Sequence, residues 1–130
     1  MKANKQHVNY KDIELAIRGL TTKIKHQADV IIGVPRGGLI PATMLSHSTG
    51  LPMILVNKDE LYKIQEIAKT QRVALVDDVN DTGETFKQIA ELGTNNLLFV
   101  SVFKDPQSTF DSEFVFTTRG KWIVFPWETK

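Results

Sequence analysis

The sequence contains no cysteine and little histidine. The absence of cysteine from all 130 residues excludes disulfides and thiolate metal sites. The three histidines, His7, His26 and His47, lack the spacing of metal ligands, and we interpret them as solvated surface residues. Neither residue type therefore indicates a metal centre.

The sequence also lacks an excess of charge of one sign and a long apolar run. Its 16 basic and 15 acidic residues leave a net charge of +1, which gives no support to nucleic-acid binding. No apolar stretch approaches the roughly 20 residues that a membrane helix needs, and Met1–Gln6 is not followed by the apolar segment of a signal peptide. We therefore expect a soluble cytoplasmic protein that binds neither nucleic acid nor membrane.

The composition that remains is ordinary for a globular protein. Apolar residues make up 42% of the chain and charged residues 24%, which argues against disorder. A chain of this length can bury its own core, and it shows no internal repeat, low-complexity tract or linker. We therefore predict a single domain over residues 1–130.

One stretch in the middle of the chain combines an apolar run, three acids and a small turn. The run Val73–Val76 is typical of a strand buried on both faces of a parallel sheet. Asp77 and Asp78 follow at its expected carboxyl end, where open α/β sheets bind their ligands. Asp81 then precedes Thr82–Thr85, a turn whose backbone N–H groups suit a phosphate. Acids for hydroxyls or a metal, beside amides for a phosphate, suggest a phosphorylated sugar.

A structural role for Asp81 stays open at this point. Asp81 and Glu84 have the spacing of a helix capping box, with an aspartate in place of the usual Ser or Thr. The helix that they would begin contains Phe86 and Ile89 and ends at Gly93. This interpretation leaves the two preceding acids unexplained.

A second strand-loop-helix unit precedes this stretch. Val30–Val34 is an apolar strand, Pro35–Gly38 forms a tight loop, and Pro41 fits the first turn of a helix that Gly50 ends. The paired glycines let a ligand approach the main chain, and Arg36 supplies a forked cation for phosphate oxygens. An ordinary turn with an exposed arginine is an equally good interpretation.

Strand and helix patterns alternate along the chain, which predicts an α/β fold with a mostly parallel sheet. An amphipathic helix is expected around Ile13–Ile24. The other expected strands are Met53–Val56, Leu97–Val102 and Phe114–Phe116. The polar segment Asn57–Arg72 fits a mobile flap, a short helix or a plain connection.

Both tryptophans, Trp122 and Trp127, lie near the end of the chain. Exposing two such rings is unfavourable, so they either close the core or form a wall for a flat ligand.

These motifs resemble those of the type I phosphoribosyltransferases. Val73–Thr85 resembles their phosphoribosyl pyrophosphate motif, in which a hydrophobic strand, two acids, a third acid and a Thr-Gly-x-Thr turn follow in order. Val34–Pro41 resembles the loop that binds the pyrophosphate end in the same family. Phe103–Pro106 and Trp122–Glu128 resemble base-binding elements of the bacterial xanthine-guanine phosphoribosyltransferases.

The resemblance implies a fold and a reaction. The fold is an open, mostly parallel sheet flanked by helices, with a core over about residues 8–117 and a minimal C-terminal base-binding hood over about residues 118–130. In the reaction, a purine base attacks the anomeric carbon of phosphoribosyl pyrophosphate, pyrophosphate leaves and a nucleoside monophosphate forms. The expected base is a 6-oxopurine (guanine, xanthine or hypoxanthine), and the expected assembly is a homodimer or homotetramer.

The resemblance also assigns roles to residues. Asp81 would handle the proton of the base, while Asp77 and Asp78 would hold the ribose hydroxyls directly or through Mg²⁺. These three acids are the implied catalytic residues. The residues implied to bind phosphoribosyl pyrophosphate are Arg36, Gly37, Gly38, Asp77, Asp78, Asp81, Thr82, Gly83, Glu84 and Thr85. The residues implied to bind the base are Lys104, at its six-position oxygen, Trp122, stacked on it, and Ile123, through its backbone. The loop that contains Arg36 often has a non-proline cis peptide in this family.

One segment departs from the family pattern, and three other functions compete. Asn57–Arg72 is shorter than the usual catalytic flap and lacks its Ser-Tyr pair, so we expect water exclusion to be either poorer or supplied by a neighbouring subunit. A response-regulator receiver domain also has an acid pair and a later lysine, but its acids follow the first strand and it has no counterpart of Pro35–Gly38. A non-catalytic regulator that senses nucleotides, and a transferase for another base, stay open.

Overall fold

The computed structural model describes residues 4–93 and 95–128, and its main feature is a parallel five-stranded sheet in the order β3-β2-β4-β5-β6. A second, two-stranded parallel sheet pairs β1 with β7. The elements are β1 (Lys5–His7), α1 (Tyr10–Ile24), β2 (Val30–Gly33), α2 (Leu39–Thr49), β3 (Met53–Ile54), the 3₁₀ turn η1 (Lys58–Glu60), α3 (Tyr62–Ala68), β4 (Val73–Asn80), α4 (Glu84–Ala90), β5 (Leu97–Lys104), β6 (Phe116–Thr117) and β7 (Trp122–Val124).

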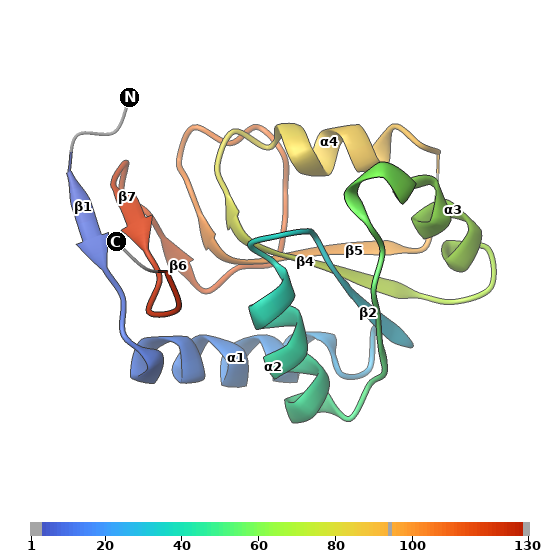
Figure 1. Cartoon of the computed structure of the whole chain (residues 1–130), viewed down its shortest axis with the longest axis horizontal. Coiled ribbons are helices and arrows are strands. Elements are labelled where there is room, and N and C mark those ends of the chain that lie inside the picture. Colours follow the sequence, from blue (N-terminus) through green and yellow to red (C-terminus); the bar gives the residue numbers. More distant parts are fainter. Residues whose placement is uncertain (1–3, 94, 129–130) are drawn as a thin grey trace.

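Helices cover both faces of the five-stranded sheet. Figure 1 shows α1 and α2 below the sheet and α3 and α4 above it. The lower layer packs the apolar side chains of α1 and α2 against Ala74 and Val76 of β4. The upper layer packs α3 and α4 against Val73 and Leu75 of the same strand. The predicted α/β architecture with a mostly parallel sheet is confirmed, whereas the prediction of a single domain stays a prediction.

Helix α1 follows the sequence pattern closely. Its apolar stripe from Ile13 to Ile24 is buried, as predicted. A capping box begins the helix, because the Asp12 N–H donates to Asn9 Oδ1 (2.8 Å) and the Asn9 N–H donates to Asp12 Oδ2 (3.3 Å). No helix in the described part of the chain is both long and apolar enough to cross a membrane.

The unit from β2 to α2 also agrees with expectation. Pro41 lies in the first turn of α2, and Gly50 ends this helix with a left-handed φ of 80°. The peptide bond between Pro35 and Arg36 is cis, as the resemblance implied.

Strand β4 is longer than predicted. It continues from Val76 through both acids to Asn80, because β5 also continues and pairs with it up to Asn80 and Lys104. Strand pairing uses backbone groups, so polar side chains at the sheet edge do not end it. Asp77 and Asp78 therefore lie within the paired length of β4 and not after its end.

Other differences concern short elements. β1 was not predicted, since its three residues are polar and exposed. The segment Asn57–Arg72 contains η1 and α3, which supports the short-helix alternative, with Ile64 and Ala68 buried under the upper layer. Strand β3 covers only the first half of Met53–Val56, and β6 begins at Phe116, where the expected strand ended.

Candidate active site

The paired acids of β4 lie at the carboxyl edge of the sheet, with their side chains tied to the backbone. The Asp78 N–H donates to Asp77 Oδ1 (2.8 Å), and the Val79 N–H donates to Asp78 Oδ1 (2.7 Å). Burial, and the negative charge of Asp78 beside it, raise the pKa of Asp77 to about 8. The pair therefore forms a site that would gain from a cation or a hydroxyl donor.

The turn after β4 forms a small pocket of about 50 Å³. Gly83 precedes α4 with a left-handed φ of 90°, and the Glu84 N–H donates to Thr82 Oγ1 (3.2 Å). The lining residues are Asp77, Val79, Asn80, Asp81, Thr82, Gly83, Glu84, Thr85 and Phe86. Every residue that was predicted to hold the 5′-phosphate thus lines one pocket, next to one of the paired acids.

Asp81 does not act as a helix cap. The residue preceding α4 is Gly83, which makes no side-chain cap bond, and the first N–H of the helix, that of Glu84, donates to Thr82 Oγ1. The capping box of Asp81 and Glu84 is therefore wrong, because the turn places Asp81 too far before the helix. Instead, Asp81 Oδ1 accepts a hydrogen bond from Gln107 Nε2 (2.9 Å).

The glycine loop after β2 runs against β4. The Val34 N–H donates to Val76 O (2.7 Å), and the Gly38 N–H donates back to Val34 O (2.9 Å). A Cβ atom at Gly38 would overlap the Val76 carbonyl oxygen, and one at Gly37 would overlap the Asp78 carboxylate. Gly38 therefore requires glycine because the backbone of β4 approaches it closely, whereas a side chain at Gly37 would displace the Asp78 carboxylate.

The exposed side of this loop borders a cavity of about 650 Å³. The lining residues are Arg36, Gly37, Ile40, Asp78, Trp127 and Glu128. The arginine is exposed, so its guanidinium is accessible to an anion. Asp78 thus lies between the glycine loop and the rest of the sheet edge.

A third cavity, of about 220 Å³, lies under the C-terminal segment. Its lining residues are Asp78, Val79, Asp81, Thr118, Lys121, Trp122, Ile123, Phe125 and Glu128. It shares Val79 and Asp81 with the pocket at Thr82–Thr85, and it shares Asp78 and Glu128 with the cavity at Arg36. The three spaces are therefore neighbours along one edge of the sheet.

The two tryptophans differ in their surroundings, one fitting a wall for a flat ligand and the other closure of the core. Trp122 lines the 220 Å³ cavity and is 53% exposed, which suits a wall for a flat ligand. Trp127 stacks on Phe125, with ring centroids 4.8 Å apart and planes 10° apart, and packs against the lower core. One ring is thus available to a ligand and the other mainly closes the core.

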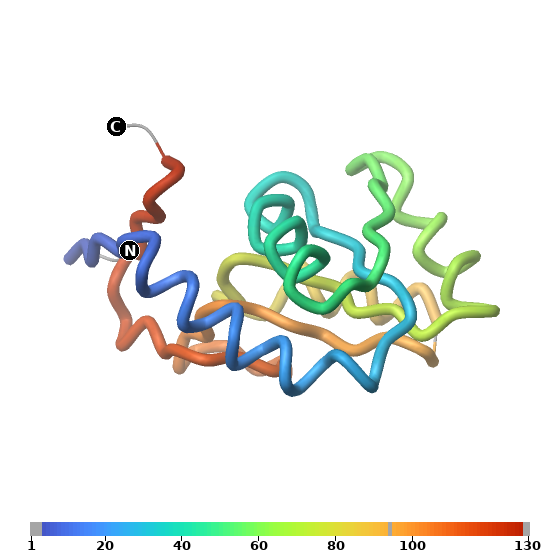
Figure 2. The backbone as a smooth tube through the Cα atoms, turned by 90° about the horizontal axis from the view of Figure 1, so that it is seen from below, coloured from blue at the N-terminus to red at the C-terminus, as the bar shows by residue number. Residues whose placement is uncertain are grey.

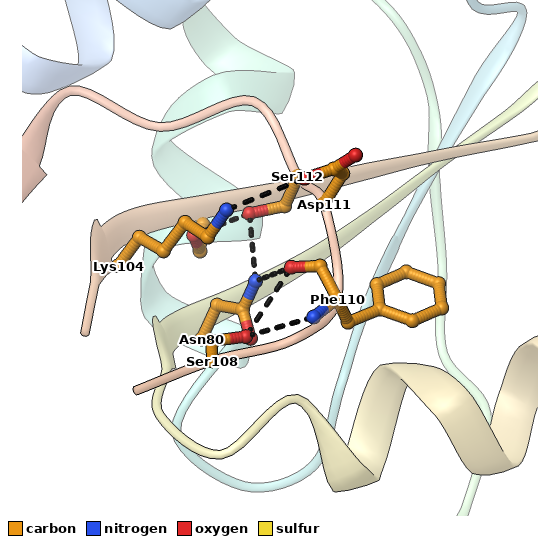
Figure 3. A network of polar contacts seen from close by, with 7 residues as sticks. Asn80, Lys104, Ser108, Phe110, Asp111 and Ser112 are labelled. Carbon is orange, nitrogen blue, oxygen red and sulfur yellow. Dashed lines mark hydrogen bonds and ion pairs between the residues drawn. The ribbon is translucent and has the colours of Figure 1, made fainter. Parts of the chain in front are cut away.

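The structure does not bring Lys104 into this cavity. Lys104 ends β5, and its ammonium lies 3.5 Å from Asp111 Oδ1 and 5.7 Å from the centre of the Phe114 ring. Figure 3 shows this side chain directed at Asp111, beside the polar contacts of Asn80.

Residues that the sequence did not single out also line the site. Thr118 and Lys121 come from the turn before β7 and reach the cavity at Trp122. Gln107 reaches Asp81 from the loop after β5. No local pattern marks these residues, because they reach the site only when distant segments pack together.

The paired acids fit a magnesium ion. Within residues 4–93 and 95–128, no group of three or more His, Cys, Asp or Glu side chains could hold a metal by itself. Mg²⁺ is commonly bound through one or two carboxylates, with substrate oxygens and water completing its shell. The raised pKa of Asp77 supports the fit, since a cation would offset the repulsion between Asp77 and Asp78.

A further cavity, of about 470 Å³, adjoins the 220 Å³ cavity through Lys121, which lines both. It is bordered by Gln6 and Val8 from the β1 segment, by Phe103, and by Phe116 of β6. Its lining includes Phe103, from a segment that resembles a base-binding element, but none of the individual residues to which the resemblance assigns a role.

Comparisons with known proteins agree with this geometry. The family model described as the phosphoribosyl transferase domain matches residues 5–130. The xanthine-guanine phosphoribosyltransferase of Idiomarina loihiensis is 29% identical over 130 residues, which cover 88% of this chain and 78% of that protein. The orotate phosphoribosyltransferase of Caldanaerobacter subterraneus subsp. tengcongensis is 35% identical over 92 residues, which cover 67% of this chain and 47% of that protein.

A solved structure extends the similarity to nearly the whole chain. The crystal structure of a purine phosphoribosyltransferase from Pyrococcus horikoshii is 34% identical and superposes with a TM-score of 0.81, covering 98% of this chain and 96% of that chain. The chain therefore belongs to the phosphoribosyl transferase domain family and is a type I phosphoribosyltransferase related to the bacterial xanthine-guanine enzymes.

Proposed function

We propose that the protein transfers the phosphoribosyl group of phosphoribosyl pyrophosphate to a 6-oxopurine: guanine, xanthine or hypoxanthine. A ring nitrogen of the base forms a bond to the anomeric carbon, and the bond from that carbon to pyrophosphate oxygen breaks. Pyrophosphate leaves with the bonding electrons, and the base loses its proton. The observation that carries the proposal is the position of Asp81, which lines both the pocket at Thr82–Thr85 and the cavity at Trp122.

Two of the three neighbouring spaces suit the two ends of phosphoribosyl pyrophosphate. The 5′-phosphate would lie in the turn Thr82–Thr85, where backbone N–H groups and hydroxyls can donate to it. Arg36, with the backbone of Gly37 and Gly38, would bind the pyrophosphate. Asp77 and Asp78 lie between these ends and would accept hydrogen bonds from the ribose hydroxyls. A sugar with a phosphate at one end and a pyrophosphate at the other would therefore span the edge of the sheet.

The purine would occupy the 220 Å³ cavity. Trp122 offers its exposed face for stacking, and Ile123 offers its backbone to the two-position substituent. Lys104 would reach the six-position oxygen only after its ammonium leaves Asp111. Binding of the base is thus expected to break that ion pair.

Asp81 is the residue proposed to hold or accept the proton of the base, since a positioned carboxylate can act in this way. The transition state would resemble an oxocarbenium ion, as in glycoside cleavage. Arg36 would stabilise the negative charge that develops on pyrophosphate. Magnesium bound to Asp77 and Asp78 would supply further positive charge beside the substrate oxygens.

The function is tested by measuring pyrophosphate release with magnesium, phosphoribosyl pyrophosphate and one base at a time. Guanine, xanthine, hypoxanthine, adenine, uracil and orotate form the panel, the last because one relative is an orotate enzyme. Release with one or more 6-oxopurines is expected. Release with orotate or uracil alone would refute purine transfer. No release with any base would refute the catalytic proposal and favour the nucleotide-sensing alternative.

The role of Asp81 is tested by Asp81→Asn, which keeps the shape of the side chain but cannot accept a proton at neutral pH. We expect kcat to fall roughly 100-fold or more, in the range of general acid–base catalysis, while the Kd for phosphoribosyl pyrophosphate changes little. Equal losses in turnover and in binding would make Asp81 a ligand and not a proton acceptor.

A further inference from the structure

The side chain of Gln107 contacts Asp81 from outside the phosphoribosyl pyrophosphate motif. Gln107 lies in the loop after β5, and its Nε2 donates to Asp81 Oδ1 at 2.9 Å. A hydrogen bond to a carboxylate is stronger than one between neutral groups. Both side chains border solvent, so the contact can orient Asp81 only if the loop itself is held firmly.

Asp105 holds the start of this loop. It is only 3% exposed, and its carboxylate accepts hydrogen bonds from the Gln107 N–H (3.0 Å) and from Thr118 Oγ1. Its own N–H donates to Asn80 O (2.9 Å), and its carbonyl accepts from the Ser108 N–H (3.0 Å). One buried residue thus fixes the backbone of Gln107 to the end of β4, and also ties it to Thr118, which lines the cavity at Trp122.

Asn80 holds the middle of the loop. Figure 3 shows its carboxamide between Ser108, Phe110 and Ser112. Ser108 Oγ donates to Asn80 Oδ1 (2.7 Å), and Asn80 Nδ2 donates to Phe110 O (2.8 Å) and to Ser112 Oγ (3.1 Å). Asn80 is 3% exposed, so these bonds satisfy a buried amide and make displacement of the loop unfavourable.

We propose that Gln107 is a positioning residue for the transferase reaction, which fixes the orientation of the Asp81 carboxylate by holding its Oδ1 atom. The inference rests on the proposed role of Asp81. The carboxylate of an aspartate rotates broadly about its last bond, because that torsion has no sharp rotamers. A donor on an anchored loop restricts this rotation, and Asp81 then presents a defined edge to the cavity that Trp122 also lines.

The test is Gln107→Leu, which puts a slightly shorter apolar side chain in place of the carboxamide and removes the donor. The matched control is Gln88→Leu, the same change at an exposed position of α4. With the best 6-oxopurine of the panel, we expect kcat of Gln107→Leu to fall about tenfold, while the KM for phosphoribosyl pyrophosphate stays within about twofold. Gln88→Leu should match the unaltered chain in both constants.

A double-mutant cycle separates positioning from a general effect on the loop. If Gln107 acts through Asp81, adding Gln107→Leu to Asp81→Asn should cause no further loss of kcat. A second tenfold loss in that background would overturn the proposal, as would an unchanged kcat of Gln107→Leu alone. If the unaltered chain releases no pyrophosphate with any base, the proposed function fails first and this inference fails with it. Failure of Gln107→Leu to respond in an active enzyme refutes the positioning role alone.

Discussion

The Asp77 carboxyl is partly withdrawn from water and lies beside Asp78, and both conditions raise its pKa to about 8. In the unfolded chain the same group has a pKa near 4. Between these two values the folded protein binds more protons than the unfolded chain, so its free energy of unfolding falls as the pH rises. The contribution of this group to the free energy of unfolding is therefore largest below about pH 4, and it is lost as the pH rises through about 8. Asp77, which is proposed to bind the sugar, thus destabilises the ligand-free fold as its carboxyl ionises.

Asp77→Asn should remove this pH dependence. Without ligand, we expect the variant to be more stable than the unaltered chain by about 1–3 kcal/mol at pH 9, with the difference shrinking towards pH 5. Urea unfolding at a series of pH values measures the effect. Asp59→Asn, at an exposed acid of η1, is the control and should leave the profile unchanged. A difference between Asp77→Asn and the unaltered chain that does not vary with pH would contradict the assigned pKa.

Two glycines with nearly the same backbone conformation allow a second comparison. Gly83 and Gly50 have φ values of 90° and 80°. A Cβ atom at Gly83 would lie 2.8 Å from the Phe110 Cβ and 2.9 Å from Ser108 Oγ, whereas one at Gly50 would meet nothing within 4 Å.

Gly50→Ala should therefore lower the free energy of unfolding only by the left-handed backbone strain, about 1–2 kcal/mol. Gly83→Ala should lower it by about 1–3 kcal/mol more, because the Asn80-anchored loop must shift. Denaturant unfolding compares them, and a transferase assay should show a loss for Gly83→Ala alone. Equal losses of stability in the two variants would mean that the loop at Ser108 and Phe110 moves away from an added Cβ atom at no cost in free energy.

Some residues of the site could be predicted from local sequence patterns, and others could not. The acids of β4 and the glycines near Arg36 were predictable, because a local pattern places them at the edge of a buried strand. Gln107 was not, since its contact with Asp81 depends on a loop that Asn80 and Asp105 hold from distant positions.

At the scale of elements, the least expected feature is the pairing of β1 with β7. Gln6 is aligned with Ile123, and flanking hydrogen bonds run from the Trp122 N–H to Asn4 O (2.8 Å) and from the Val8 N–H to Val124 O (3.0 Å). β1 thus supports the backbone that carries Trp122. Its polar, exposed residues gave no apolar periodicity, whereas α1 was predictable because it buries a regular stripe.

Gln6→Pro should weaken base binding selectively. Proline cannot donate to a strand ladder, so the change disturbs the pairing that supports Trp122. We expect the KM for the base to rise roughly threefold to tenfold, equivalent to about 1 kcal/mol, with the KM for phosphoribosyl pyrophosphate little changed. Gln6→Ala keeps the backbone donor and serves as the control. A similar rise in the KM for the base and in the KM for phosphoribosyl pyrophosphate would mean that the change disturbs the whole fold.

At the scale of the whole molecule, several large apolar side chains lie on the surface. Leu55 and Tyr62, on either side of η1, are 69% and 58% exposed, and Leu15 of α1 is 54% exposed. Exposed apolar groups favour association when they meet a complementary surface. Leu55 lies just before the segment Asn57–Arg72, which is short for a catalytic flap, and Tyr62 lies within it.

We therefore expect a homodimer or homotetramer in solution. Sedimentation velocity over a range of concentrations should give a species of two or four times the 14.7 kDa of one chain. A single 14.7 kDa species throughout that range would contradict the prediction, and water exclusion would then have to come from one chain alone.

The parallel pairing of Lys5–His7 with Trp122–Val124 also matters while the chain is being made. Figure 2 shows these segments together at the end of the molecule away from α3, although nearly the whole sequence separates them. Contacts between such distant segments form late, because a long loop must close first. The ribosome must release residues 122–124 before the first strand finds its partner. A nascent chain that stops after α4 already contains the residues proposed to bind the phosphates and the ribose, but it lacks Trp122, the ring proposed to stack on a base.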